Sequence, residues 1–210
     1  METILTSPLL QWFANNNSWL QIIPLVCGVT YMTLQIFQHK WMWYFSILTS
    51  VAALAIAVTN LDGEAWAPLW AQVVLNAYLI VIAISGIIRW RKLDSESGGR
   101  IHIVKMSKKR IITVLVAVAI ANPIATWLLG FTSDPAPALD GISLVLSFVA
   151  AWLLSRSHIE QYLFWIAANA LIIAVYASQG MWLMAAMYTF YIGTCIVGFI
   201  NWKKNGVVVE

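Results

Sequence analysis

The chain has 210 residues, of which 61% are hydrophobic and only 10% carry a charge. Its mean hydropathy is +0.79, whereas soluble domains average about 45–50% apolar and about 25% charged residues. This composition excludes a water-soluble domain and predicts an integral membrane protein. Because nearly all of the chain is needed to cross the bilayer, no room is left for a catalytic domain outside the membrane.

Seven apolar stretches have the roughly 17 to 25 residues that a helix needs to cross the hydrocarbon core. In chain order the predicted spans are Trp19–Phe37, Trp41–Thr59, Trp66–Trp90, Ile111–Phe131, Leu139–Ser155, Glu160–Ser178 and Met181–Trp202. We therefore predict one all-α membrane domain over residues 1–210, with seven transmembrane helices. An odd number of spans places the two termini on opposite sides of the membrane.

Positive charge is confined to alternate connections between the predicted spans. All twelve Lys and Arg residues follow spans one, three, five or seven, and most of them lie between Arg89 and Arg110. The opposite connections carry Asp62, Glu64 and Asp134. Since cytoplasmic loops are enriched in Lys and Arg, we place the N-terminus outside and the C-terminus in the cytoplasm. The net charge of +3 then belongs to helix ends, and nucleic acid binding is not expected.

Several tryptophans lie at or near the ends of the predicted spans, where the indole ring prefers the headgroup region. These residues are Trp19, Trp41, Trp43, Trp66, Trp90, Trp182 and Trp202. Trp165 is an exception, because it lies about one turn inside the sixth span. The basic stretch 91–110 contains Ser-Glu-Ser-Gly-Gly and is predicted to be a cytoplasmic linker.

The two halves of the chain show a faint internal similarity. An offset of 119 residues aligns Tyr162 with Trp43, and an offset of 112 residues aligns Trp202 with Trp90. Two three-helix units separated by one helix have the same orientation in the membrane, which is a parallel repeat. The alternative is the chance self-similarity of apolar helices. The predicted units are a first repeat at 19–90, a connecting helix at 111–131 and a second repeat at 139–202.

A polar stripe runs along the sixth span. His158, Tyr162, Trp165, Asn169 and Tyr176 are separated by four, three, four and seven residues. These spacings place all five residues on one face of a helix. We therefore predict that this face lines an internal cavity, with helix packing as the alternative.

The third and seventh spans carry comparable stripes, which include Asn76 on the third and Tyr188 and Tyr191 on the seventh. The three stripes are predicted to face one cavity near mid-depth, because a buried amide in hydrocarbon needs hydrogen-bonding partners. Aromatic faces with interspersed amides suit a flat heterocycle that carries hydroxyls. A cationic ring would add cation–π attraction.

Several chemistries have no residues to support them. No carboxylate or Lys lies in the middle third of any predicted span, although such charges are typical of proton relays. The last span lacks the Lys that a retinal protein needs, and the sequence contains no zinc-protease, serine-hydrolase or phosphate-loop motif. We therefore expect neither an enzyme nor an ATP-driven pump, and no cofactor or metal.

A further set of residues is recognisable as a family pattern. It comprises Asp140, Leu146-Ser147, Ala150, Arg156, Ile159-Glu160-Gln161-Tyr162, Trp165-Ile166, Asn169, Gln179-Gly180, Tyr188 and Trp202, with Gly86-Ile87-Ile88-Arg89-Trp90 in the first half. These residues resemble the motifs of the PnuC-type vitamin transporter family, whose best-known members carry nicotinamide riboside. The family's motifs include Glu-Asn-Trp-x-x-Trp and Gly-Trp-x-x-Trp.

This resemblance implies a three-plus-one-plus-three helix arrangement related to the SWEET sugar transporters. It also implies a homotrimer in the bacterial inner membrane, and facilitated diffusion of a vitamin or nucleoside that a cytoplasmic kinase then traps. Together with the polar stripes, it gives the candidate substrate-binding residues Trp165, Asn169, Tyr162, Asn76, Tyr188, Tyr191 and Trp43.

Four departures from the family pattern concern the substrate. Ile87 and Tyr162 stand where the family has Trp, Asn76 stands where Gln is usual, and Ala83 stands where nicotinamide riboside carriers often have Asn. Nicotinamide riboside is the first expectation for the substrate, and thiamine, riboflavin or a deoxynucleoside are the alternatives. A membrane receptor or scaffold that transports nothing is the alternative class of function.

Overall fold

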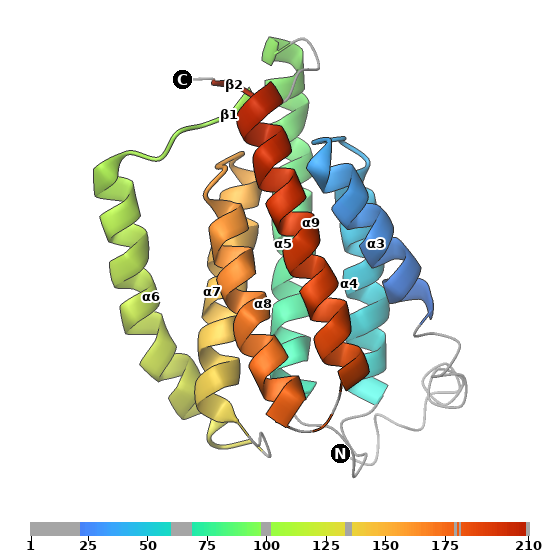
Figure 1. Cartoon of the computed structure of the whole chain (residues 1–210), viewed down its shortest axis with the longest axis vertical. Coiled ribbons are helices and arrows are strands. Elements are labelled where there is room, and N and C mark those ends of the chain that lie inside the picture. Colours follow the sequence, from blue (N-terminus) through green and yellow to red (C-terminus); the bar gives the residue numbers. More distant parts are fainter. Residues whose placement is uncertain are drawn as a thin grey trace.

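The computed structural model describes residues 22–59, 69–97, 102–132, 136–178, 180 and 182–208. Within these ranges the chain is almost entirely helical (Figure 1). The elements are α3 (Ile22–Ile36), α4 (Met42–Thr59), α5 (Leu69–Ser97), β1 (His102–Ile103), α6 (Lys108–Leu129), α7 (Pro137–Ser155), α8 (Gln161–Ser178), α9 (Trp182–Asn205) and β2 (Val207–Val208). The prediction of an all-α chain is confirmed.

Each predicted span overlaps one of these helices over the residues that the structure describes. Five of the described helices, α5 to α9, are long and apolar enough to cross a membrane, whereas the apolar stretches of α3 and α4 are shorter. The end of α5 and the start of α6, which flank the predicted linker 91–110, differ from the prediction. α5 continues to Ser97, and α6 already begins at Lys108, because Ser107 caps it by accepting a hydrogen bond from the Arg110 backbone N–H at 3.3 Å.

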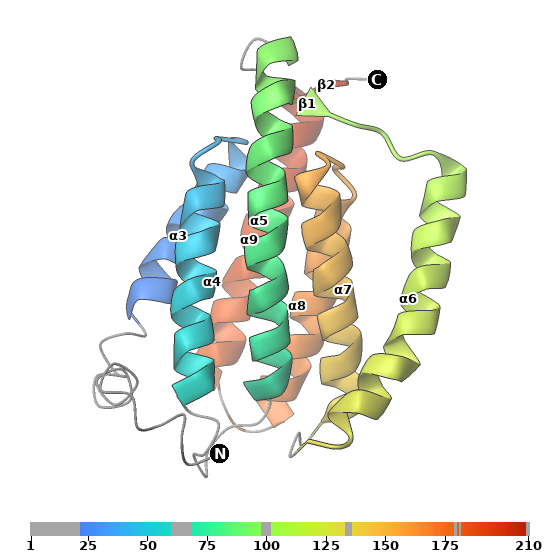
Figure 2. The same cartoon turned by 180° about the vertical axis from the view of Figure 1, so that it is seen from behind.

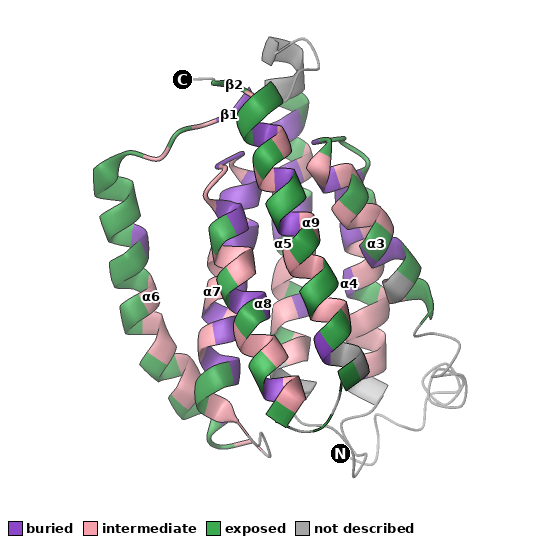
Figure 3. Ribbon diagram, in the orientation of Figure 1, coloured by how far each residue is buried: buried purple, intermediate pink, exposed green. Residues whose placement is uncertain are grey.

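Six of the helices form a closed ring. Around the ring α3 packs against α4, α4 against α5, α5 against α7, α7 against α8, α8 against α9, and α9 against α3 (Figures 1 and 2). α6 stands outside the ring and packs against α7. Figure 3 shows that buried residues face the inside of the ring, whereas α6 is exposed along most of its length. The core therefore belongs to the six-helix ring.

Two helix-to-helix turns have the same unusual backbone. Gln38, between α3 and α4, has φ 52°, and Ser157, between α7 and α8, has φ 61°. They are the only non-glycine residues with positive φ in the described part of the chain, and this conformation is uncommon for such residues. In both turns the next N–H donates to the carbonyl five positions earlier, at 2.9 and 3.0 Å. The two positions are 119 residues apart, which is the offset found in the sequence.

Both turns lie at the end of the ring where β1 and β2 meet. There, residues 102–107, called the strap, run toward α6 (Figure 1). The Gln38 side chain bonds both backbone groups of His102, accepting from its N–H at 2.6 Å and donating to its carbonyl at 2.9 Å. Val104 donates its N–H to the Ser157 carbonyl at 3.1 Å. β1 pairs in parallel with β2. The strap is thus fixed to both turns and to the end of α9.

Candidate functional site

An aromatic pair from the first half of the chain lies inside the ring at the strap end. Trp43 of α4 and Trp90 of α5 meet edge to face, with ring centroids 5.1 Å apart and an interplanar angle of 83°. Gly86 makes this contact possible, because a Cβ at that position would lie only 2.5 Å from the Trp43 ring. Trp90 also meets the His102 ring at 5.4 Å. The strap therefore rests on this pair.

The second half contains a matching pair. Tyr162 of α8 and Trp202 of α9 meet edge to face at 5.3 Å and 87°, and a Cβ on Gly198 would lie 2.6 Å from the Tyr162 ring. The Trp202 indole N–H donates to the Gln35 carbonyl at 3.0 Å, and the Tyr162 hydroxyl donates to the same oxygen at 3.4 Å. These bonds tie α8 and α9 to the end of α3. The two pairs belong to one hydrophobic core.

The assignment of several tryptophans to the membrane interface was wrong. Trp43, Trp90 and Trp202 are only 2%, 1% and 0% exposed, because each faces a partner across the ring. Trp41 and Trp182, at 53% and 70% exposed, fit the interface. Trp19 and Trp66 lie outside the described residues. The sequence does contain a signal that Trp90 and Trp202 are buried: a glycine, Gly86 or Gly198, stands four residues before each of them.

Below the second pair, α8 brings two polar groups into the interior. Trp165 packs against the aromatic core, and its indole nitrogen is buried without a hydrogen bond. Asn169, one turn further along α8, is 5% exposed, and its amide forms no hydrogen bond with any residue that the structure describes. Leaving a buried amide without partners is unfavourable by about 1–3 kcal/mol. This position therefore suits a bound polar molecule or water.

Three tyrosines gather nearer the opposite end of the ring. Tyr188 of α9 stacks on Tyr176 of α8, with centroids 5.5 Å apart and planes 30° apart. Tyr191 meets Tyr188 edge to face at 5.4 Å. The carboxylate of Asp140, a buried residue in the first turn of α7, interacts electrostatically with Tyr176 and Tyr188. An acidic group with aromatic faces suits a cationic ring.

Two residues of the predicted stripes form hydrogen bonds outside a shared cavity. Asn76 on α5 is buried, but its amide N–H donates to the Gln72 carbonyl of its own helix at 2.8 Å. His158 does not belong to the stripe on α8, because it lies in the turn before that helix. Its Nδ1 is 2.6 Å from the Val104 carbonyl and must therefore carry the proton and donate to the strap. Burial lowers the pKa of His158.

The structure thus groups the candidates in layers. Tyr162 and Trp43 lie in the packed aromatic core at the strap end, Trp165 and Asn169 follow below, and Tyr188 and Tyr191 lie toward the opposite end. Among the described residues, no group of three or more His, Cys, Asp or Glu is placed to hold a metal ion. The arrangement is therefore suited to binding a flat polar molecule by stacking and by hydrogen bonds.

The sequence and the fold both have known relatives. Residues 18–204 match the family model described as nicotinamide mononucleotide transporter. A relative from Neisseria mucosa, named nicotinamide riboside transporter PnuC, is 24% identical over 201 residues, which cover 90% of this chain and 74% of the relative. A relative of the same name from Haemophilus influenzae is 25% identical over 191 residues, which cover 90% and 80%.

A solved structure shares the fold. It is the crystal structure of the vitamin B3 transporter PnuC, with a TM-score of 0.68 and 21% identity over 91% of this chain and 84% of that chain. The resemblance predicted from the sequence motifs is confirmed by these matches. Because the family model covers most of the sequence, the chain belongs to the nicotinamide mononucleotide transporter family.

Proposed function

We propose that this protein carries nicotinamide riboside across the inner membrane of a bacterium by facilitated diffusion. The observation that carries the proposal is the buried amide of Asn169, which has no hydrogen-bonding partner among the described residues and lies one turn from the Trp165 ring. A stacking ring beside an amide with free bonding capacity matches an aromatic carboxamide. The relatives from Neisseria mucosa and Haemophilus influenzae are named for the same substrate.

We assign the substrate contacts to Trp165 and Asn169, with Tyr188, Tyr191 and Asn76 completing the site. Tyr162 and Trp43 are fully packed against other rings, so their role in the proposal is to close the strap end of the site. The Asp140 carboxylate beside Tyr176 and Tyr188 supports a positively charged ring. This favours nicotinamide riboside or thiamine over riboflavin and deoxynucleosides, which carry no positive ring.

Three-plus-one-plus-three architecture is part of the proposal, with α3–α5 and α7–α9 as parallel repeats and α6 as the connecting helix. The two matching turns and the two aromatic pairs with their glycines support it. So does the packing of α5 on α7 and of α9 on α3, since exchanging the repeats converts one contact into the other. In transporters built from repeats, the substrate site lies near the midplane between them.

The strap end is proposed to face the cytoplasm, with all seven described helices spanning the membrane and the N-terminus outside. This orientation is supported by the basic residues at the strap end, which include Lys105, Lys108, Arg110, Arg156 and Lys203. Among residues with described side chains, the acidic Asp140 lies toward the opposite end.

Transport is proposed to need no ion gradient, because no midplane acid is available to carry a proton. Accumulation would then come from phosphorylation by a cytoplasmic kinase. A homotrimer is the proposed assembly, and the exposed apolar length of α6 outside the ring supports a role for this helix between protomers.

Binding titrations of the purified protein test the substrate. The ligands are nicotinamide riboside, thiamine, riboflavin and a deoxynucleoside, measured by calorimetry. The expected result is saturable binding of nicotinamide riboside and weaker or no binding of the ligands without a positive ring. Tight binding of riboflavin or a deoxynucleoside alone would contradict the proposed substrate, and binding of none of the four would favour a receptor or scaffold.

A further inference from the structure

Three arginines from three different helices converge at the strap end. Arg89 is on α5, Arg110 is in the first turn of α6, and Arg156 is the C-terminal cap of α7. α7 packs against both α5 and α6, so the helix that Arg156 caps is the neighbour of the helices that carry the other two arginines. Burial and the positive charges of Arg89 and Arg110 lower the pKa of the Arg156 guanidinium. Arg156 is thus close enough to each of the other two arginines for their charges to act on it.

None of the three guanidinium groups forms an ion pair with a residue whose side chain the structure describes. Among the side chains that the structure describes here, the carboxylate of Glu160 raises the pKa of His158, and the positive charges of Arg110 and Arg156 lower it. The first turn of α6 adds Lys108 and Lys109 and contains no acidic residue, although cations are unfavourable at a helix N-terminus. The cluster therefore has a net positive charge that an anion would compensate.

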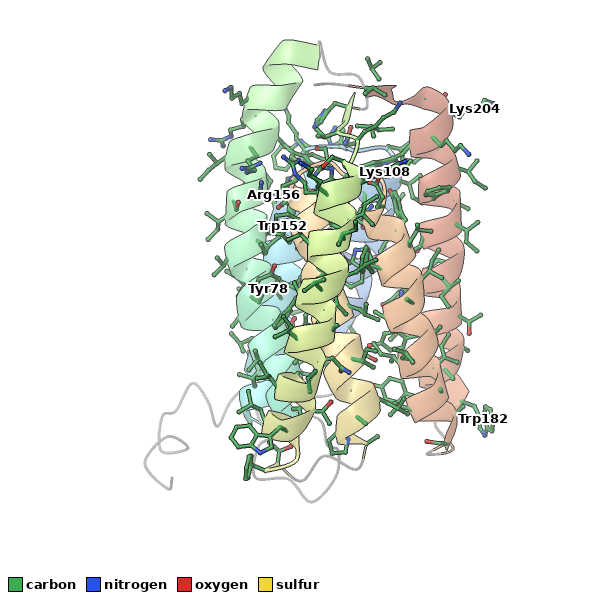
Figure 4. All side chains as sticks on the ribbon, turned by 90° about the vertical axis from the view of Figure 1, so that its left-hand side faces the viewer. Tyr78, Lys108, Trp152, Arg156, Trp182 and Lys204 are labelled. Carbon is green, nitrogen blue, oxygen red and sulfur yellow. The ribbon has the colours of Figure 1, made fainter. Side chains whose placement is uncertain are left out.

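One of the three side chains is held in place before any anion binds. The Arg156 guanidinium lies over the Trp152 ring, 4.4 Å from its centroid. Figure 4 shows Trp152 and Arg156 one above the other, at about the level of Lys108 at the start of α6. A stacked guanidinium keeps its fork of N–H donors free, and this fork matches two oxygens of a phosphate group.

Apolar surface continues from the arginine cluster toward the middle of the membrane. On α5 the exposed side chains include Ile88, Ile84 and Val81, and on α6 they include Ile112 and Leu115. In a membrane these side chains meet acyl chains, and the arginines lie at the level of the headgroups. Basic sites between helix ends on the cytoplasmic side are suited to acidic headgroups.

From this arrangement we propose that Arg89, Arg110 and Arg156 form a binding site for the phosphodiester headgroup of an anionic phospholipid. The acyl chains of this lipid lie along the exposed apolar side chains of α5 and α6. The site is separate from the interior of the ring, so the proposal does not depend on the identity of the transported substrate.

The test counts lipids bound to the purified full-length protein by native mass spectrometry. The delipidated protein in neutral detergent is titrated with dioleoyl phosphatidylglycerol, dioleoyl phosphatidylcholine or inorganic phosphate. We expect phosphatidylglycerol to bind at least about tenfold more tightly than phosphatidylcholine, because each basic residue near an acidic headgroup contributes about a factor of five. Equal binding of the two lipids would overturn the proposal. So would displacement of phosphatidylglycerol by low millimolar phosphate, which would identify a site for free phosphate.

A matched pair of variants separates a specific site from general attraction. The triple variant Arg89→Gln, Arg110→Gln, Arg156→Gln is expected to weaken phosphatidylglycerol binding at least tenfold. The triple variant Lys40→Gln, Lys203→Gln, Lys204→Gln removes the same charge from other positions at the strap end and is expected to change it by less than about threefold. Equal losses in both would overturn the proposal.

If the arginine triple variant does not fold, the single variant Arg110→Gln tests the site. Its folding should be unaffected, because the Arg110 side chain is exposed and makes no hydrogen bond to a described residue. We expect it to weaken phosphatidylglycerol binding about fivefold. No change in this single variant would likewise count against the site.

Discussion

The two aromatic pairs have the same packing but different polar contacts. In the second half, the Tyr162 hydroxyl and the Trp202 indole both donate to the Gln35 carbonyl. In the first half, the indole nitrogens of Trp43 and Trp90 are buried without a hydrogen bond. The shape of each pair is therefore set by a ring against a glycine, whereas hydrogen bonds fix only the second pair to a neighbouring helix. The pair next to Trp165 and Asn169 is therefore the more firmly anchored of the two pairs.

The largest expected effect concerns the groups below the pairs. Replacing Trp165 by Ala removes a stacking surface of about 0.5–1.5 kcal/mol and the buried apolar area of the indole. Substrate affinity measured by calorimetry should fall at least about tenfold. The equivalent position in the first half is Ser46, 119 residues earlier, so Ser46→Ala should stay within about twofold. Equal effects at the two positions would contradict a site built mainly by the second half.

Overpacking the glycines should destabilise both pairs to a similar degree. A methyl group on Gly86 or Gly198 would meet an aromatic ring at about the same distance, and such overpacking destabilises a protein by about 1–3 kcal/mol. Thermal unfolding in detergent measures the loss for Gly86→Ala and Gly198→Ala. Gly193→Ala on α9 is the control, because a Cβ there would contact nothing within 4 Å and Ala favours the helix. A stable Gly198→Ala variant would show that the close approach is not needed.

Paired Trp to Phe changes should separate the hydrogen bond from the packing. Trp202→Phe loses the bond to the Gln35 carbonyl, whereas Trp90→Phe loses no hydrogen bond. Since a hydrogen bond contributes about 0.5–1.5 kcal/mol to stability, the unfolding free energy should fall by about 1 kcal/mol more for Trp202→Phe. Equal losses would mean that the polar contacts to α3 contribute nothing measurable.

The smallest expected effect is a pH dependence of stability from the strap. Because the pKa of His158 is lowered in the folded protein, the unfolded chain takes up a proton first as the pH falls below about 6.5. Stability should therefore be level above about pH 6.5, decrease as the pH falls from about 6.5 to the folded pKa, and level off again below the folded pKa. His158→Gln should weaken this dependence relative to the unchanged protein. A melting temperature with the same pH slope in the variant and in the unchanged protein would contradict the assignment.

Sequence patterns could predict the helices but not which way every ring points. Apolar length alone located all seven described helices, because hydrocarbon requires a minimum span. The same length does not show on which face of its helix Trp90 or Trp202 lies. These helices are apolar on all sides, so the side that faces lipid and the side that faces the core have similar residues. The role of His158 could not be predicted either, because its partner Val104 is 54 residues away. The matching turns at Gln38 and Ser157 could not be predicted as turns, because the only sign of them in the sequence is the faint similarity at an offset of 119 residues.

The buried aromatic core also gives the molecule an optical signal of its own. Trp43 and Trp90 lie nearly perpendicular at 5.1 Å, and Trp90 and Trp202 are 6.3 Å apart, so their electronic transitions couple and produce near-ultraviolet circular dichroism. Separated rings would lose this signal. A change in packing where the two halves meet under the strap can therefore be followed in the unlabelled protein, with no reporter group added.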